Sequence, residues 1–120
     1  MTRVFLLDDH EVVRRGVREL IDAEDDLEVV GEASTAGEAL ARVKLLSPDV
    51  AILDIGMPGM SGYEVAQQMR REAWGAGIVL VAITGWGQEE DKRRARAAGF
   101  DHHLTKPVDP VVLEQLISQL

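Results

Sequence analysis

The chain has no cysteine and only three histidines among its 120 residues. The lack of cysteine excludes disulfides and thiolate metal sites. The histidines, two of them adjacent at His102 and His103, form a poor set of ligands for a transition metal. Any metal bound by this chain is therefore expected to be a hard cation held by oxygen atoms.

Long apolar runs and low-complexity tracts are also missing. No stretch approaches membrane-spanning length, and residues 1–3 lead into a short apolar segment without a basic leader or cleavage motif. With 46% hydrophobic and 28% charged residues, the composition is that of an ordinary globular protein. We expect one cytoplasmic domain over residues 1–120, with no membrane attachment.

Positive charge is scarce. Thirteen Lys and Arg residues stand against twenty-one Asp and Glu residues, which gives a net charge of −8. An excess of negative charge disfavours nonspecific binding to the phosphate backbone of nucleic acid. We therefore expect no direct binding of the chain to nucleic acid.

Short β-rich runs alternate along the chain with segments of helical period. This alternation is typical of a parallel sheet with crossover helices. The strands are expected at residues 4–8, 27–33, 50–53, 78–83 and 102–104.

Helix-start signals follow these strands. Thr35 and Ser61 are each followed three residues later by Glu, which is the capping-box pattern. Asp109 and Pro110 suit the N-cap and first position of the last helix. In the first helix, at about residues 11–23, Gly16 is expected to allow close packing.

Polar side chains fall where the predicted strands end. In an open parallel sheet, reactive groups belong at the carboxyl ends of the strands. The residues found there are Asp8, Asp9, Asp54, Thr84 and Lys106. Each has an ordinary explanation by itself, as a helix or turn cap, a strand-end hydroxyl or a surface lysine. If all of these explanations held, the five residues would fall at the carboxyl ends of the strands only by coincidence.

Three carboxylates in one cleft repel each other and raise at least one pKa, so such a site needs positive charge. Mg²⁺ can supply two units and Lys106 a third. Asp54 could then attack a phosphoryl group whose oxygens contact the cation, Lys106 and the Thr84 hydroxyl. The product would be an aspartyl phosphate.

Five short motifs occur in a fixed order along the chain: LDDH at residues 7–10, LDIGMPG at 53–59, ITG at 83–85, AGFD at 98–101 and KP at 106–107. Through this ordered set, the chain resembles the receiver domain of bacterial two-component response regulators. The resemblance implies a flavodoxin-like (βα)5 α/β fold, a three-layer sandwich whose parallel sheet has the order 2-1-3-4-5.

The resemblance also implies roles for the site residues. Asp54 would accept a phosphoryl group from a histidine kinase or a histidine phosphotransfer protein. Asp9, Asp54 and the backbone carbonyl of Gly56 would bind Mg²⁺, or Mn²⁺, with Asp8 acting mainly through a metal-bound water. Lys106 would be the phosphate counter-ion, and the peptide bond before Pro107 would be cis.

Signalling, rather than catalysis, is the implied outcome. Thr84 would act as a switch hydroxyl, and His103 takes the position of an aromatic switch residue; together they would alter the face formed by the fourth helix, fifth strand and fifth helix. The domain would only assist its own phosphorylation and its slow autodephosphorylation. Gly56 and Trp86 would flank the site where water attacks the aspartyl phosphate. We expect a monomer or weak dimer.

The two halves of the chain resemble different relatives. The first half is similar to receivers of helix-turn-helix transcription factors, and the second half to receivers of hybrid histidine kinases. A chimera, natural or engineered, is one hypothesis, and a flavodoxin-like scaffold that folds but does not signal is an alternative function. An aspartyl-phosphate hydrolase is a remote alternative because Gly56 stands where haloacid-dehalogenase-type enzymes place an acid/base aspartate. An FMN-binding protein is disfavoured because Asp8 and Asp9 would repel phosphate.

Overall fold

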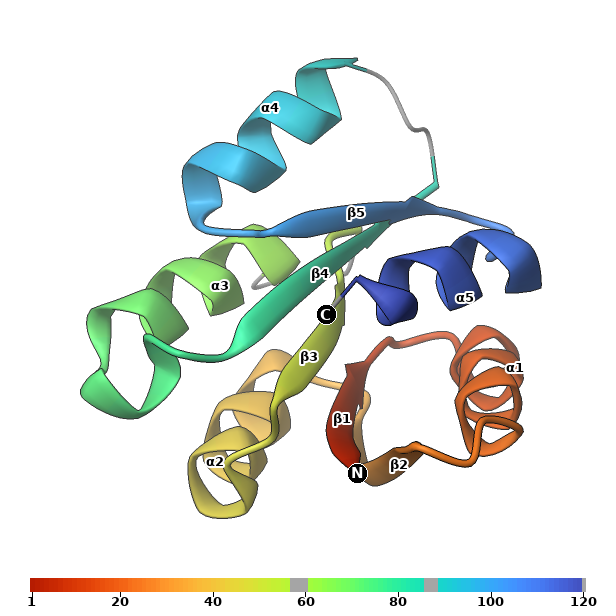
Figure 1. Cartoon of the computed structure of the whole chain (residues 1–120). Coiled ribbons are helices and arrows are strands. Elements are labelled where there is room, and N and C mark those ends of the chain that lie inside the picture. The colour runs from red at the N-terminus through yellow and green to blue at the C-terminus, as the bar shows by residue number, and fades with distance from the viewer. Residues whose placement is uncertain (57–60, 86–88, 120) are drawn as a thin grey trace.

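Five parallel strands form the centre of the molecule in the computed structural model, which describes residues 1–56, 61–85 and 89–119. The order across the sheet is β2-β1-β3-β4-β5 (Figure 1). The strands are β1 (Thr2–Leu7), β2 (Leu27–Ala33), β3 (Val50–Asp54), β4 (Val79–Thr84) and β5 (His102–Thr105). The predicted flavodoxin-like fold and its strand order are confirmed.

Helices cover both faces of this sheet (Figure 1). Residues of α2, α3 and α4 join one buried apolar cluster, and residues of α1 and α5 join the other. The helices are α1 (Glu11–Asp22), α2 (Ala36–Leu46), α3 (Gly62–Arg71), α4 (Glu89–Ala98) and α5 (Pro110–Ser118), with a short 3-10 helix η1 (Ala73–Gly75) after α3. Within the part of the chain that is described, no helix has the length and apolar character needed to cross a membrane.

The central strand β3 is buried along its whole length. Ala51 and Leu53 pack toward α2, α3 and α4, whereas Val50 and Ile52 pack toward α1 and α5. This double burial explains why the strand reads as a continuous apolar run, as is typical of parallel sheets covered on both faces. It also fixes the position of Asp54, the last residue of the strand.

The close packing expected at Gly16 is wrong, whereas the predicted helix starts at Thr35 and Ser61 are confirmed, with a capping hydrogen bond only at Thr35. A Cβ at Gly16 would meet no atom within 4 Å, so close packing does not explain that glycine. Ser61 is the N-cap of α3, but its side chain makes no capping hydrogen bond. By contrast, the Thr35 hydroxyl accepts a hydrogen bond of 3.3 Å from the backbone N–H of Glu38, as the capping box predicts.

Gly62 is the glycine that the site requires. A Cβ on Gly62 would lie 2.4 Å from the backbone oxygen of Asp54 and 2.9 Å from Cα of Ile55. These are backbone atoms, which cannot move aside as the end of a flexible side chain can. The start of α3 therefore packs directly against the end of β3, and only a residue without a side chain fits there.

A pair of glycine substitutions tests this contact. We expect Gly62→Ala to lower the free energy of unfolding by about 1–3 kcal/mol, because overpacking forces a backbone shift. We expect Gly16→Ala, on an exposed helix surface, to raise it by about 0.5–1 kcal/mol. Urea unfolding of both variants measures the difference. Equal stability of the two variants would contradict the close approach.

Candidate functional site

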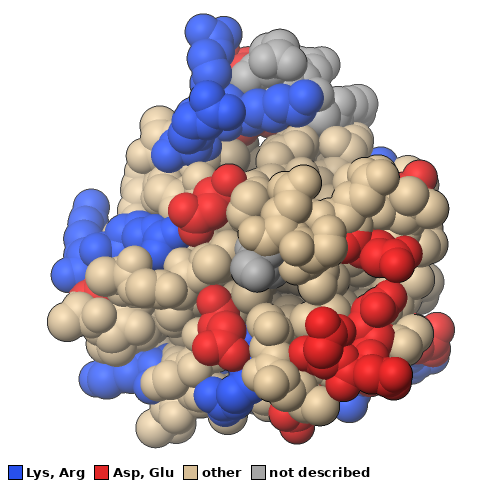
Figure 2. All heavy atoms as spheres, viewed as in Figure 1, with Lys and Arg blue, Asp and Glu red and all other residues tan. Residues whose placement is uncertain are grey.

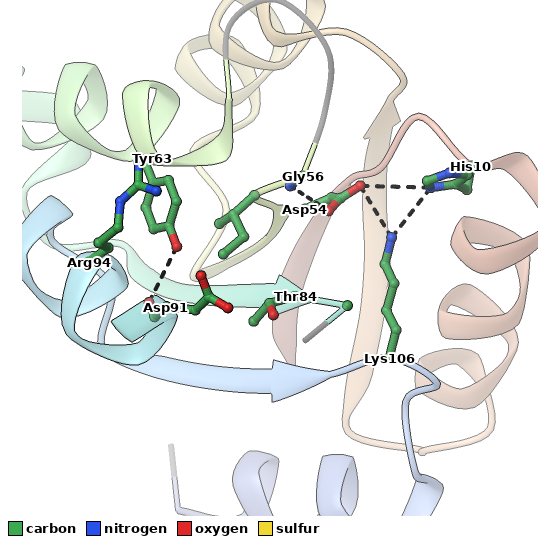
Figure 3. A pocket seen from close by; sticks show the side chains of 10 residues that line it. His10, Asp54, Gly56, Tyr63, Thr84, Asp91, Arg94 and Lys106 are labelled. Carbon is green, nitrogen blue, oxygen red and sulfur yellow. Dashed lines mark hydrogen bonds and ion pairs between the residues drawn. The ribbon is translucent and has the colours of Figure 1, made fainter. Parts of the chain in front are cut away.

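Side chains from four different strand ends converge at one edge of the sheet. Asp8 follows β1, Asp54 ends β3, Thr84 ends β4 and Lys106 follows β5. A cavity of about 400 Å³ opens there and is lined by Asp54, Thr84, Lys106 and neighbouring residues (Figure 3). The sequence therefore placed these groups on the correct edge.

Asp54 is a buried carboxylate, with 2% of its surface exposed. Its Oδ1 accepts a hydrogen bond of 2.9 Å from the backbone N–H of Gly56, and its Oδ2 accepts one of 3.2 Å from Lys106 Nζ (Figure 3). Both oxygens are thus oriented by donors. One edge of the carboxylate faces the cavity that Lys106 also lines.

Asp8 lies beside Asp54 and is equally buried. Its Oδ1 accepts a hydrogen bond of 2.8 Å from the backbone N–H of His10, whereas its Oδ2 has no hydrogen bond and forms an ion pair of 3.4 Å with Lys106 Nζ. Burial raises the pKa of the Asp8 carboxyl above its usual value, and the nearby Asp54 charge raises it further, against the opposing effects of the His10 N–H and Lys106.

His10 is a member of this cluster that the sequence interpretation missed. Its Nδ1 lies 3.2 Å from an oxygen of Asp8, 3.2 Å from an oxygen of Asp9 and 3.9 Å from Oδ2 of Asp54. Together the four residues offer ligand atoms that all lie within 4.8 Å of one another. The sequence does carry a signal for it, because His10 directly follows the acidic pair Asp8 and Asp9. Although the three histidines together make a poor set of metal ligands, this does not apply to one histidine beside carboxylates.

Tyr63 is a second residue that the sequence did not single out. It projects from α3 into the cavity wall, and its hydroxyl donates a hydrogen bond of 3.3 Å to the backbone oxygen of Asp91 in α4 (Figure 3). The guanidinium of Arg94 lies 4.4 Å from the centre of its ring. Burial raises the pKa of Tyr63, and the charge of Asp91 adds to the rise. Tyr63 thus connects α3 to α4 beside the cavity.

His103 lies apart from the acidic cluster. It pairs with Ala82 of β4 and borders a smaller cavity of about 120 Å³ together with Lys92 and Phe100. Its Nε2 is buried without a hydrogen bond, and burial lowers the pKa of its imidazole, with a further lowering from the Lys92 charge. The imidazole is therefore next to α4.

Three further positions singled out in the sequence are Pro107, Gly56 and Trp86. The peptide bond between Lys106 and Pro107 is cis. Gly56 lies beside Asp54, to which its N–H donates. Trp86, and residues 57–59 of the longest motif, lie outside the described residues.

Comparison with known proteins gives a consistent assignment. The family of the response regulator receiver domain matches residues 4–118. The chain is 35% identical over 116 residues to the nitrate/nitrite response regulator protein NarL of Escherichia coli (strain K12), a match that covers 97% of this chain and 53% of NarL. It is also 35% identical over 120 residues to the DNA-binding transcriptional activator DevR/DosR of Mycobacterium tuberculosis, covering 100% of this chain and 54% of that protein. The chain spans about half the length of these relatives.

Solved structures agree with the sequence comparison. A two-component response regulator of the LuxR family from Aurantimonas sp. SI85-9A1 superposes with a TM-score of 0.90 at 33% identity, over 99% of this chain and 84% of that one. The chemotaxis response regulator CheY4 of Vibrio cholerae superposes with a TM-score of 0.87 at 28% identity, over 99% of this chain and 98% of that one. The chain belongs to the response regulator receiver domain family.

Proposed function

We propose that Asp54 accepts a phosphoryl group from the phosphohistidine of a histidine kinase or a histidine phosphotransfer protein. The observation that carries this proposal is the buried Asp54 carboxylate, which lies 3.2 Å from the Lys106 ammonium and lines an open cavity together with Thr84. A carboxylate placed in this way can act as a nucleophile, and the cavity leaves room for the donor group.

In the proposed step, an oxygen of Asp54 forms a bond to phosphorus while the P–N bond to the donor imidazole breaks. The imidazole nitrogen takes up the electron pair of that bond, and negative charge stays on the phosphoryl oxygens. Transfer of this kind depends on neutralising that charge and on alignment. Lys106 carries the positive charge nearest to Asp54, and the Thr84 hydroxyl stands on the neighbouring strand end.

A divalent cation fits the acidic cluster. Asp8 has a buried oxygen without a hydrogen bond, and burial together with the Asp54 charge disfavours its ionised form. We propose that Asp9, Asp54 and the carbonyl of Gly56 hold Mg²⁺, or Mn²⁺, and that Asp8 acts through a bound water. When bound, the cation would neutralise charge on the acids and on the phosphoryl oxygens.

The signal would leave the site on the side of α4. We propose Thr84 and His103 as the switch pair. In support, His103 lies opposite Ala82, two residues before Thr84 on β4, and borders α4. Phosphorylation adds negative charge at Asp54, and attraction of the Thr84 hydroxyl toward it would free space for the imidazole.

We propose that the chain itself does not contact nucleic acid, although DevR/DosR is described as DNA-binding. The net charge of −8 supports this proposal. On the face shown in Figure 2, Lys and Arg gather over α4, while Asp and Glu gather lower in the view, toward α1. The receiver would store and pass on a phosphoryl signal rather than turn over a substrate. A hydrolase is disfavoured because Gly56 offers no acid/base group two residues beyond Asp54.

Phosphoryl labelling tests the acceptor. With acetyl phosphate or phosphoramidate and Mg²⁺, we expect intact-mass spectrometry to show one phosphoryl adduct on the native chain and none on Asp54→Asn, which lacks the nucleophile. The exposed Asp25→Asn is the matched control and should label normally. Equal labelling of Asp54→Asn would show that the acceptor is another residue, and a native chain that does not label would favour the non-signalling scaffold.

Removal of the lysine charge tests its role. We expect Lys106→Ala to slow labelling of Asp54 by about a hundredfold or more, because a preorganised donor to the phosphoryl oxygens is lost. Lys44→Ala, on the exposed end of α2, serves as the control. The rate of adduct formation under one donor concentration measures both, and an unchanged rate in Lys106→Ala would contradict the proposal.

Charge crowding predicts a pH-dependent stability difference. Folding raises the pKa of Asp8, so protonation of this carboxyl favours the folded state. Its contribution to the free energy of unfolding is complete below about pH 4 and is lost as the pH rises through the pKa of Asp8 in the folded protein. In EDTA at pH 7, we therefore expect Asp8→Asn to melt about 3–6 °C above the native chain, the shift that about 1 kcal/mol produces in a domain of this size.

The gain should shrink as the pH falls toward 4 and should disappear when Mg²⁺ stabilises the native chain. Asp25→Asn controls for loss of net charge. Thermal melts at several pH values measure all three proteins, and a gain that grows toward low pH would contradict the charge argument.

A further inference from the structure

The imidazole of His10 lies against the acidic cluster, while the backbone of the same residue begins helix α1. His10 is the N-cap residue of α1, yet its side chain makes no capping hydrogen bond. Instead, its backbone N–H donates to Oδ1 of Asp8 at 2.8 Å, and this short turn brings Nδ1 to 3.2 Å from oxygens of both Asp8 and Asp9. The side chain is thus oriented by the acids.

The contacts of Nδ1 conflict with one another. The two carboxylates would accept a proton from this nitrogen, whereas the Lys106 ammonium, 3.4 Å away, can only donate to it. One nitrogen atom cannot donate to the carboxylates and accept from the ammonium at the same time. A cation among these groups could accept the Nδ1 lone pair and carboxylate oxygens together.

A second observation points to a ligand at the same place. The Asp8 side chain is 4% exposed, and its Oδ2 is buried without a hydrogen bond, with the ion pair to Lys106 as its described contact. Four possible ligand atoms lie within 4.8 Å of one another: one carboxylate oxygen from each of Asp8, Asp9 and Asp54, and one ring nitrogen of His10. The cluster therefore offers one nitrogen among oxygens.

We propose that His10 Nδ1 is a direct ligand of the cation site and shifts its preference from Mg²⁺ toward later first-row transition cations such as Ni²⁺. The inference rests on the proposed function, since the same acids hold the cation. Mg²⁺ binds oxygen ligands almost exclusively, whereas imidazole nitrogen raises affinity along the series from Mn²⁺ to Ni²⁺. His10 would be a specificity-determining residue for the metal.

Calorimetric titration with Mg²⁺ and with Ni²⁺ tests the assignment. The native chain is compared with His10→Phe, which keeps a flat ring without nitrogen, and with His10→Ala. His102→Phe, which removes a histidine from β5 outside the cluster, is the control. We expect the ratio of Ni²⁺ to Mg²⁺ affinity to fall by about tenfold or more in both His10 variants and to stay constant in the control.

A spectroscopic measurement identifies the bond itself. In the Mn²⁺-loaded native chain, pulsed electron paramagnetic resonance should detect coupling to a histidine nitrogen, which changes when histidine is labelled with ¹⁵N. The coupling should be absent in His10→Phe and present in His102→Phe. Its persistence in His10→Phe would overturn the assignment.

Two affinity outcomes would also overturn it. If both cations bind more tightly after His10 is removed, the imidazole is a competing positive charge rather than a ligand. If neither affinity changes, His10 is a bystander. Labelling of Asp54 in the native chain with Mg²⁺ decides the proposed function independently, so the two failures are distinguishable.

Discussion

The convergence of buried carboxylates at one sheet edge is the constraint on which the site depends. Asp8 and Asp54 are each almost fully buried, and burial of like charges is unfavourable unless opposite charge is close. Lys106 meets this need by lying within 3.4 Å of both. Because the three residues are far apart in sequence, only the folded sheet can bring the lysine to the acids, and the chemistry of the site is therefore a property of the fold.

The strand order converts sequence separation into proximity. β1 pairs with β3 over Val4 to Leu7, so the residues that follow these strands emerge side by side. β4 and β5 continue the sheet on the other side of β3 and deliver Thr84 and Lys106 to the same edge. Helices on both faces bury the strands and leave this edge as the place where polar groups can gather.

The fold and much of the site follow from the sequence because both depend on regular signals. Apolar runs fixed the strands to within about two residues at each end, and strand-end position identified Asp8, Asp54 and Lys106. Orientation was harder to predict. The His10 imidazole, although 60% exposed, lies beside the acids because the His10 backbone N–H donates to Asp8, and Tyr63 meets the cavity through contacts with α4. Neither contact follows from a periodic pattern in the sequence. Ser61 likewise shows that a capping-box sequence does not guarantee the capping hydrogen bond.

One wall of the cavity is packed backbone against backbone. At Gly62, the start of α3 touches the backbone at the end of β3 with no spare room, so that wall cannot yield when charge at Asp54 changes. On the side of α4, the Tyr63 hydroxyl donates a hydrogen bond of 3.3 Å to Asp91 and the Arg94 guanidinium lies over the Tyr63 ring, while Ala95 and Ala98 pack in the same apolar cluster as α3. A shift of the Asp54 backbone would therefore be passed directly to the start of α3, because less than the width of a methyl group separates the two segments.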